Sequence, residues 1–383
     1  MTVPLISQFS QQNQTQECSP KTNKLRFESF DYLRAIFSVA IVADHVALFD
    51  LVTILGITTF SDILYANVSC IAVPVFFQIS LFLFYIKSES LGFQYFAQKR
   101  FPKLISLYLF WVTSKVVFDL LLSGESEALT VGTSSFRKFI EFAVSGGNSP
   151  FYFFFALIFI TVLAEVLVFL FRKVESISEK LKVAYFLLVC SCILIFYLSI
   201  VGLLAGRAAG QPEAGVSSFI SSLALWDYNP LNFLPYIFTA AIAVQEFNLG
   251  KLNQLNRALK TKLGILLCLF LMFSTFEWIV LDDLLQHKRL SLVFGSWLLL
   301  YLALLSTQKV PAIVKFISSC SLGIYAFHVF FTSGLFLYNP KLLSAIAQIS
   351  PQVEVLTKFL ITLVSSIILT CLFRRIRILR YFV

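Results

Sequence analysis

Two residues that could bind and deprotonate a substrate lie eleven positions apart in one apolar stretch, FDYLRAIFSVAIVADHVALFD: Arg34 and His45. Eleven residues of α-helix turn through about 1100°, only about 20° more than three turns, so both side chains leave the same face about 16 Å apart. We expect Arg34 near the rim of a membrane and His45 near its middle. A cation above a titratable base suits an anionic ligand whose reactive end reaches inward.

Each of these residues also has a simpler interpretation. Arg34 could anchor the helix by extending its side chain to lipid headgroups, and His45 could hydrogen-bond a neighbouring helix. The shared face favours a site, because ionisable residues inside a membrane are costly. Other polar side chains of the apolar stretches could line it or join helices, namely Asp31, Asp44, Gln78, Ser80, Tyr325 and His328.

A basic cluster opens a later apolar stretch, QKRFPKLISLYLFW, and comprises Lys99, Arg100 and Lys103. Arginine forks and lysine ammonium groups bind phosphates well, so the cluster could clamp a phosphorylated ligand. Ordinary anchoring of a membrane helix by positive charge is the alternative.

We expect the remaining charged residues of the apolar stretches to form ion pairs. Lys115 and Asp119 are four residues apart, which predicts a structural ion pair on one helix. Glu165 and Glu277 could pair with Arg34 or Lys115. His287 stands beside two basic residues in a short connection, where we expect it to be solvated.

The composition identifies the setting of these residues. Of 383 residues, 58% are hydrophobic and only 13% are charged, whereas soluble domains carry about 25% charge. This excludes an ordinary cytosolic enzyme and predicts an all-α polytopic membrane protein. We expect about ten transmembrane helices, over residues 31–54, 65–86, 101–122, 149–171, 183–206, 231–247, 261–281, 290–307, 312–336 and 355–373.

The distribution of Lys and Arg predicts the orientation. With the N-terminus inside, 21 of the 30 fall in cytoplasmic segments and 7 outside, which favours two cytoplasmic termini. We expect a polar, mobile tail over 1–29, a transmembrane domain over 30–373 and a basic cytoplasmic tail over 374–383. The net charge of +9 is then a topology signal, and we expect no nucleic-acid partner. The seven cysteines form no ligand motif, so we expect no metal ion.

Four segments together resemble the membrane acyltransferase-3 family of many-spanning O-acyltransferases. They are FDYLRAIFSVAIVADHV, with the Arg-x10-His spacing; VPVFFQISLFLF; KRFPKLISLYLFW; and SLGIYAFHVFF, with a Tyr and a His. The resemblance spans roughly residues 30–335. Leu81 replaces the family's usual Gly after Ser80, Lys103 replaces the second Arg of the basic motif, and the Trp-rich motif of the fourth helix appears only as PFYFFFAL.

The resemblance implies an enzyme that transfers an acyl group, commonly acetyl, from cytoplasmic acyl-CoA to a sugar hydroxyl of a surface or exported glycan. His45 would then be the general base or carry the acyl group, and Arg34 would hold a phosphate or polarise the thioester. Arg100, Lys103 and Lys99 would bind acyl-CoA. The partners would be membrane lipid and a glycan or lipid-linked saccharide, in the cell membrane. A secondary transporter or flippase, or a scaffold in glycan assembly, are the alternatives.

Overall fold

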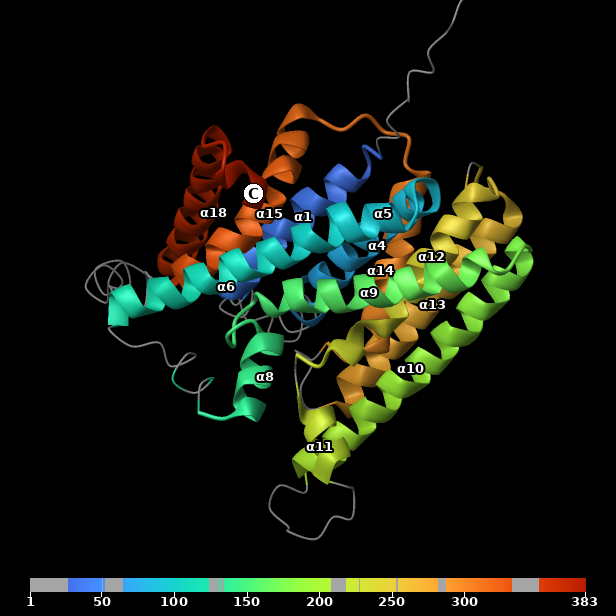
Figure 1. Cartoon of the computed structure of the whole chain (residues 1–383), viewed down its shortest axis with the longest axis horizontal. Helices are drawn as coiled ribbons and strands as arrows, with labels where there is room; N and C mark the ends of the chain where they lie inside the picture. Colours follow the sequence, from blue (N-terminus) through green and yellow to red (C-terminus); the bar gives the residue numbers. More distant parts are fainter. Residues whose placement is uncertain are drawn as a thin grey trace, which may run out of the picture.

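The chain folds into a bundle of helices (Figure 1). The computed structural model describes residues 27–49, 51, 65–123, 130, 132, 134–207, 218–226, 228–252, 254–281, 287–332 and 351–383. No strand occurs in these ranges. The longer helices are α1 (Phe30–His45), α4 (Ala72–Leu91), α6 (Phe101–Ser123), α8 (Phe136–Ser145), α9 (Tyr152–Arg172), α10 (Ile177–Arg207), α12 (Leu234–Asn248), α13 (Arg257–Val280), α14 (Leu290–Leu305), α15 (Ala312–Phe330) and α18 (Pro351–Arg375). The shorter elements are η1 (Tyr65–Ser69), α5 (Phe93–Tyr95), η2 (Phe96–Arg100), α11 (Ser218–Leu225), η3 (Pro230–Phe233) and η5 (Leu379–Phe382).

Each of the ten predicted spans overlaps one of the longer helices. Within the described ranges, seven helical segments are long and apolar enough to cross a membrane: Asn67–Leu91, Phe93–Leu122, Tyr152–Arg172, Ile177–Ala205, Arg257–Val280, Ala312–Phe330 and Gln352–Arg375. Helices α1, α12 and α14 have only 16, 15 and 16 residues. The all-helical membrane architecture is therefore confirmed, while the count of ten spans and the placement of both termini stay predictions.

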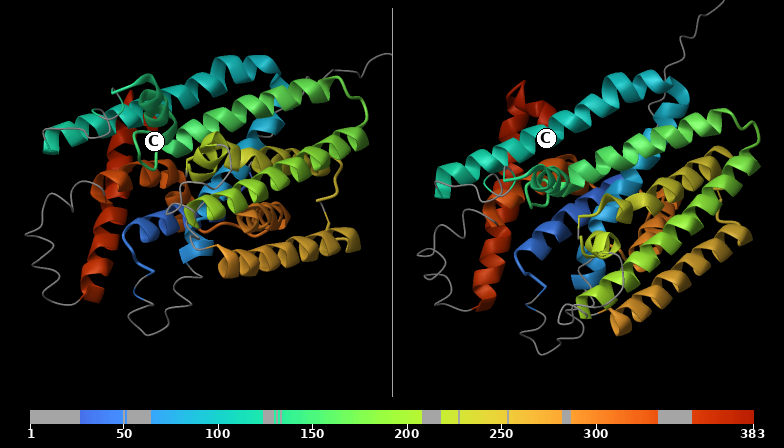
Figure 2. Two further views of the ribbon diagram at one scale, coloured as in Figure 1. Left: turned by 90° about the horizontal axis from the view of Figure 1, so that it is seen from below. Right: turned by 60° about the horizontal axis from the view of Figure 1, so that its bottom comes forward.

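Helix α4 forms the centre of the bundle. It packs against α1, α9, α12 and α14, and 78% of its most apolar window is buried, compared with 11% for α13 and 17% for α18. The outer helices expose apolar side chains such as Leu271 and Leu360, which in water would be unfavourable but in lipid are not. Figure 2 shows α13 and α18 at the margins of the bundle.

Helices α1 and α15 lie side by side and run in the same direction. Near their beginnings, Ser318 donates a hydrogen bond of 2.7 Å to Asp31; near their ends, the rings of His45 and His328 are 4.7 Å apart. Helix α15 packs in turn against α18, where Gly323 leaves no room for a β-carbon beside Thr370.

The predicted first span is too long, because α1 ends at His45. The chain turns there through Ala47, whose φ is +58°, while Leu48 N–H bonds Ala43 C=O at 2.7 Å. This is the helix-ending motif that glycine usually provides. An alanine in this conformation gives no sequence signal for a helix end.

The segment after α18 folds back onto the bundle. Trp111 donates a hydrogen bond of 3.2 Å to the carbonyl oxygen of Phe382, and the rings of Phe110 and Phe382 stack 4.0 Å apart. The C-terminal segment thus packs next to α6 through Phe382, while Arg375, Arg377 and Arg380 are exposed.

Candidate functional site

Helix α1 carries Arg34 and His45 on one unbroken helix, so their predicted spacing holds. The sequence of α1 contains no glycine or proline, and Asp31 in its first turn favours the helix dipole. Contacts with α15 fix its beginning, since Lys315 pairs with Glu28 at 3.0 Å and Ser318 bonds Asp31. This attachment holds Arg34 at the start of α1 and His45 at its end.

His45 is oriented by its own helix. Its Nδ1 lies 3.0 Å from the carbonyl oxygen of Ile41. A carbonyl only accepts, so Nδ1 carries the hydrogen and Nε2 of the neutral ring keeps its lone pair. The side chain is 35% exposed, and Asp44 Oδ2 lies 3.5 Å from Nδ1. An accessible imidazole whose Nε2 bonds no described residue, with a carboxylate nearby, has the arrangement of a general base.

His328 and Tyr325 continue this group of residues along α15. His328 is fully buried, and neither of its ring nitrogens has a hydrogen-bond partner among the described residues. Tyr325, whose ring centroid is 5.8 Å from that of His328, donates a hydrogen bond to the carbonyl oxygen of Pro150. These contacts bring the end of α15 against the beginning of α9.

Arg100 and Ser80 come together from separate segments. The Nη2 of Arg100 in η2 donates to the hydroxyl of Ser80 in α4, while its buried Nε has no partner in the described part of the chain. Gly92, with φ +71°, makes the turn between the two segments. Arg100 therefore points back toward the bundle and retains a donor for a ligand.

The other basic residues form an exposed surface beside Arg100. Lys99 and Lys103 are exposed, and the ammonium of Lys103 lies 5.6 Å above the ring of Tyr381. Lys103 experiences the positive charges of both Arg100 and Lys87. Lys87, which the motif did not include, thus adds to a surface suited to a polyanion.

Arg34 lies at the same level of the bundle as the Arg100–Ser80 pair. Phe30 at the start of α1 packs on Phe82 in the middle of α4, with ring centroids 5.6 Å apart. The η1 segment before α4 also contacts α1, so the two helices are antiparallel. Arg34 lies about 6 Å beyond Phe30 along α1, and Ser80 lies about 3 Å before Phe82 along α4. Because the helices are antiparallel, both displacements point in the same direction. The guanidinium of Arg34 bonds no described residue, and Asp31 is its electrostatic partner.

Gln78 joins two helices, which is the second of the two roles expected for it. It is fully buried, and its Nε2 donates to Thr239 Oγ1 at 2.6 Å, which joins α4 to α12. The predicted pair of Lys115 and Asp119 is confirmed at 2.6 Å.

The two buried acids have partners other than Arg34 or Lys115. Glu165 accepts from Ser88 at 2.8 Å and lies 3.6 Å from Arg172. Glu277 pairs with Arg289 at 2.9 Å.

The expectation for His287 is wrong. Its Nε2 lies 2.5 Å from the Tyr152 hydroxyl, and the following Lys288 and Arg289 are 2% and 1% exposed. Burial, and next the charge of Arg289, lower the pKa of His287 to about 4. Sequence reasoning missed Tyr152 and His287 because a histidine beside two basic residues is typical of a solvated loop. The one available signal was Glu277, an acid in an apolar run that needs a buried counter-charge.

Comparison with known proteins agrees with the resemblance seen in the motifs. A family model described as an acyltransferase domain matches residues 27–375, which is nearly the whole chain. No curated protein and no solved structure matches it. The match contains the Arg34–His45 helix, the Arg100 cluster and the end of α15, and it shows that the chain belongs to the acyltransferase-3 family of membrane acyltransferases.

Proposed function

We propose that this protein is an integral O-acyltransferase of the cell membrane that moves an acetyl group from cytoplasmic acyl-CoA to a hydroxyl of a surface or exported glycan. The observation that carries the proposal is the orientation of His45, whose Nδ1 bonds Ile41 and whose exposed side chain presents Nε2. A base in this state, on the same helix as an arginine without a hydrogen-bonded described partner, suits transfer from a phosphorylated donor.

The proposed reaction uses the two ends of α1. Arg34, Arg100 and the neighbouring lysines hold the phosphates of CoA, and the flexible pantetheine arm extends the thioester toward His45. His45 Nε2 takes the proton of the acceptor hydroxyl as its oxygen bonds the thioester carbonyl carbon. The C–S bond then breaks, and the imidazolium returns the proton to the departing sulfur. Acyl transfer through Nε2 itself is the variant of this scheme that uses the same atoms.

The proposal is tested by the glycans of cells with and without the protein. We expect mass spectrometry to show an acetyl increment only when the protein is present, and membranes to transfer labelled acetyl from acetyl-CoA to the unmodified glycan. His45→Ala should abolish both, while Arg257→Gln, at the exposed start of α13, should abolish neither. Flipping or uptake of a saccharide without acyl-CoA, with no acylated product, would overturn the proposal in favour of a transporter.

A further inference from the structure

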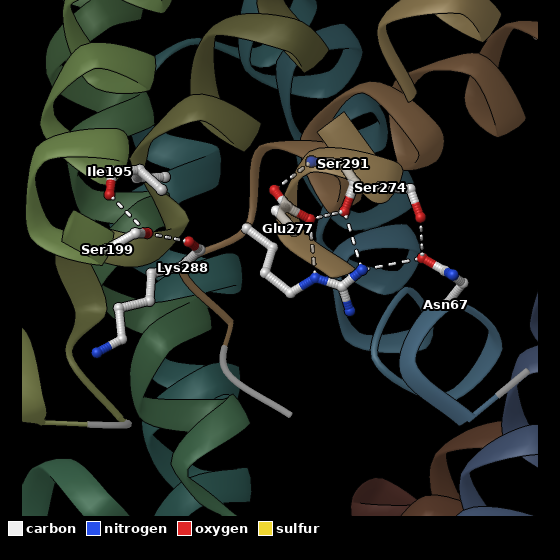
Figure 3. A network of polar contacts seen from close by, with 8 residues as sticks. Asn67, Ile195, Ser199, Ser274, Glu277, Lys288 and Ser291 are labelled. Carbon is white, nitrogen blue, oxygen red and sulfur yellow. Dashed lines mark hydrogen bonds and ion pairs between the residues drawn. The ribbon is translucent and has the colours of Figure 1, made fainter. Parts of the chain in front are cut away.

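Buried charged residues hold residues 287–289, between α13 and α14, in a fixed position inside the bundle. Arg289 donates to Glu277 at 2.9 Å and to Asn67 at 2.9 Å, and Glu277 also accepts from the backbone N–H of Ser291 at 3.1 Å. Figure 3 shows Glu277, Ser291 and Asn67 converging from three helical segments. A buried ion pair this well hydrogen-bonded fixes the position of its segment more than it adds stability.

Lys288 fastens the same segment on its other side. Its ammonium donates to the carbonyl oxygen of Ala224, and its own carbonyl oxygen accepts from Ser199 of α10. In Figure 3 the Lys288 side chain points away from Glu277, so the two basic residues hold opposite sides of the chain. His287 precedes them and is therefore held in a set position.

That position is against the beginning of α9. The His287 Nε2 is 2.5 Å from the Tyr152 hydroxyl, and the buried Nδ1 has no partner among the described residues. Tyr228 and Phe233 complete an aromatic group, with ring centroids 4.5 Å from Tyr152 and 5.6 Å from His287 respectively. Between these aromatic faces lie the bonded Tyr152–His287 pair and the unsatisfied His287 Nδ1, and the lowered pKa of His287 leaves the pair without a net charge at neutral pH.

The same residues adjoin the His45 group. Tyr152 interacts electrostatically with Tyr325 and with Asp44, the neighbour of His45. Phe153, next in sequence to Tyr152, packs on Tyr325 with ring centroids 5.1 Å apart. His45 and His328 then continue the series at the ends of α1 and α15. The aromatic group thus lies at the His45 end of the site, away from the basic cluster.

From this arrangement we propose that Tyr152 and His287 bind the acceptor and direct its hydroxyl to His45, and that the acceptor at this point is an uncharged, hydroxyl-rich sugar ring. Neutral hydrogen-bonding groups between aromatic rings suit hydroxyls and C–H faces, whereas an anionic acceptor would find no available cation in this group. The inference rests on the proposed function, and it makes Tyr152 and His287 acceptor-positioning residues.

The test measures donor and acceptor binding separately. Purified full-length protein is assayed with labelled acetyl-CoA and with the unmodified glycan extracted from cells that lack the protein, each varied in turn. We expect Tyr152→Phe and His287→Gln to raise the KM for the glycan at least about tenfold, which corresponds to about 1.4 kcal/mol, and to leave the KM for acetyl-CoA within about twofold. Tyr301→Phe is the matched control, because Tyr301 is a buried tyrosine bonded to Glu246.

Each other result is decisive. If the variants fold but lower only kcat, or raise both KM values together, Tyr152 and His287 do not bind the acceptor. If both variants, and His287→Asn as well, fail to fold, the contact between Tyr152 and His287 only stabilises the fold, and the inference is overturned. If the wild-type protein transfers no acetyl group to the glycan, the proposed function fails and the inference fails with it.

Discussion

The Nδ1 atom of His45 lies 3.0 Å from the carbonyl oxygen of Ile41, one turn earlier on α1. This contact assigns the ring hydrogen to Nδ1 and leaves Nε2 as the basic atom. A helix-terminal histidine bonded to its own backbone cannot rotate freely, so the ring of the proposed base is oriented before substrate arrives. Such orientation is what general-base catalysis requires of a side chain.

Replacing His45 should remove this base while leaving donor binding intact. We expect His45→Gln to lower kcat for acetyl transfer by about 10²- to 10⁴-fold, the usual contribution of a general base. The KM for acetyl-CoA should change little, because the residues proposed to bind its phosphates lie at the other end of α1. Steady-state kinetics on purified protein measures both values. A variant that kept more than a tenth of the wild-type kcat would exclude His45 as the base.

Replacing Arg100 should have the opposite kinetic effect. Arg100→Gln removes a guanidinium whose Nε has no partner among the described residues, so we expect the KM for acetyl-CoA to rise about tenfold or more with little change in kcat. Lys103→Ala should produce a smaller rise that disappears at high salt, because Lys103 is exposed and its interactions are screened. An unchanged KM in Arg100→Gln at low salt would show that the cluster only anchors the helix.

A structural feature can be predicted from the sequence when the interactions that determine it join residues close together in the chain. Among the described residues, the apolar runs predict every longer helix except α8. The spacing of Arg34 and His45 predicts their common helix, because both predictions depend on neighbours along the chain. The end of α1 is missed, since Ala47 adopts a positive φ that its side chain does not favour.

The contacts between distant segments are not predictable in the same way. Arg100 meets Ser80 through the turn at Gly92, and neither motif specifies that turn. His287 was expected in solvent because Lys288 and Arg289 follow it. Their burial becomes possible only when Ala224 and Glu277, distant in sequence, supply the compensating acceptors.

The buried pair of Arg289 and Glu277 should show strong coupling. Removing one partner strands a buried charge, so Glu277→Leu or Arg289→Leu alone should each cost about 3–5 kcal/mol of stability. The double variant should cost clearly less than the sum of the two. Unfolding in detergent measures the cycle, and the exposed pair of Arg137 and Glu141 is the control that should show no measurable coupling. Additive losses would mean that the two charges do not compensate each other.

His287 should make stability depend on pH. Its pKa is lowered to about 4 in the folded protein, against about 6.5 when unfolded. Between these values the unfolded chain binds a proton and the folded chain does not, so stability is lost as pH falls from about 6.5 toward 4. At about 1.4 kcal/mol per unit, the loss is at most about 3 kcal/mol. Melting temperatures from pH 7 to pH 4 should fall less steeply for His287→Gln, and parallel slopes would refute the neutral state of His287.

The turn between α8 and α9 should tolerate no side chain at Gly146. Its φ is +61°, and a β-carbon there would lie 2.5 Å from the backbone carbon of Phe151 and the backbone nitrogen of Tyr152. Backbone atoms at that distance cannot give way, so Gly146→Ala must shift the start of α9. We expect a loss of about 1–3 kcal/mol, measured by thermal unfolding in detergent. The affinity for the glycan should also fall, because Tyr152, which we propose binds it, moves. Gly264→Ala in α13 is the matched control, since nothing lies within 4 Å of its β-carbon position. That variant should gain about 0.5–1 kcal/mol from the helix propensity of alanine, and equal behaviour of the two variants would contradict the assignment of the turn.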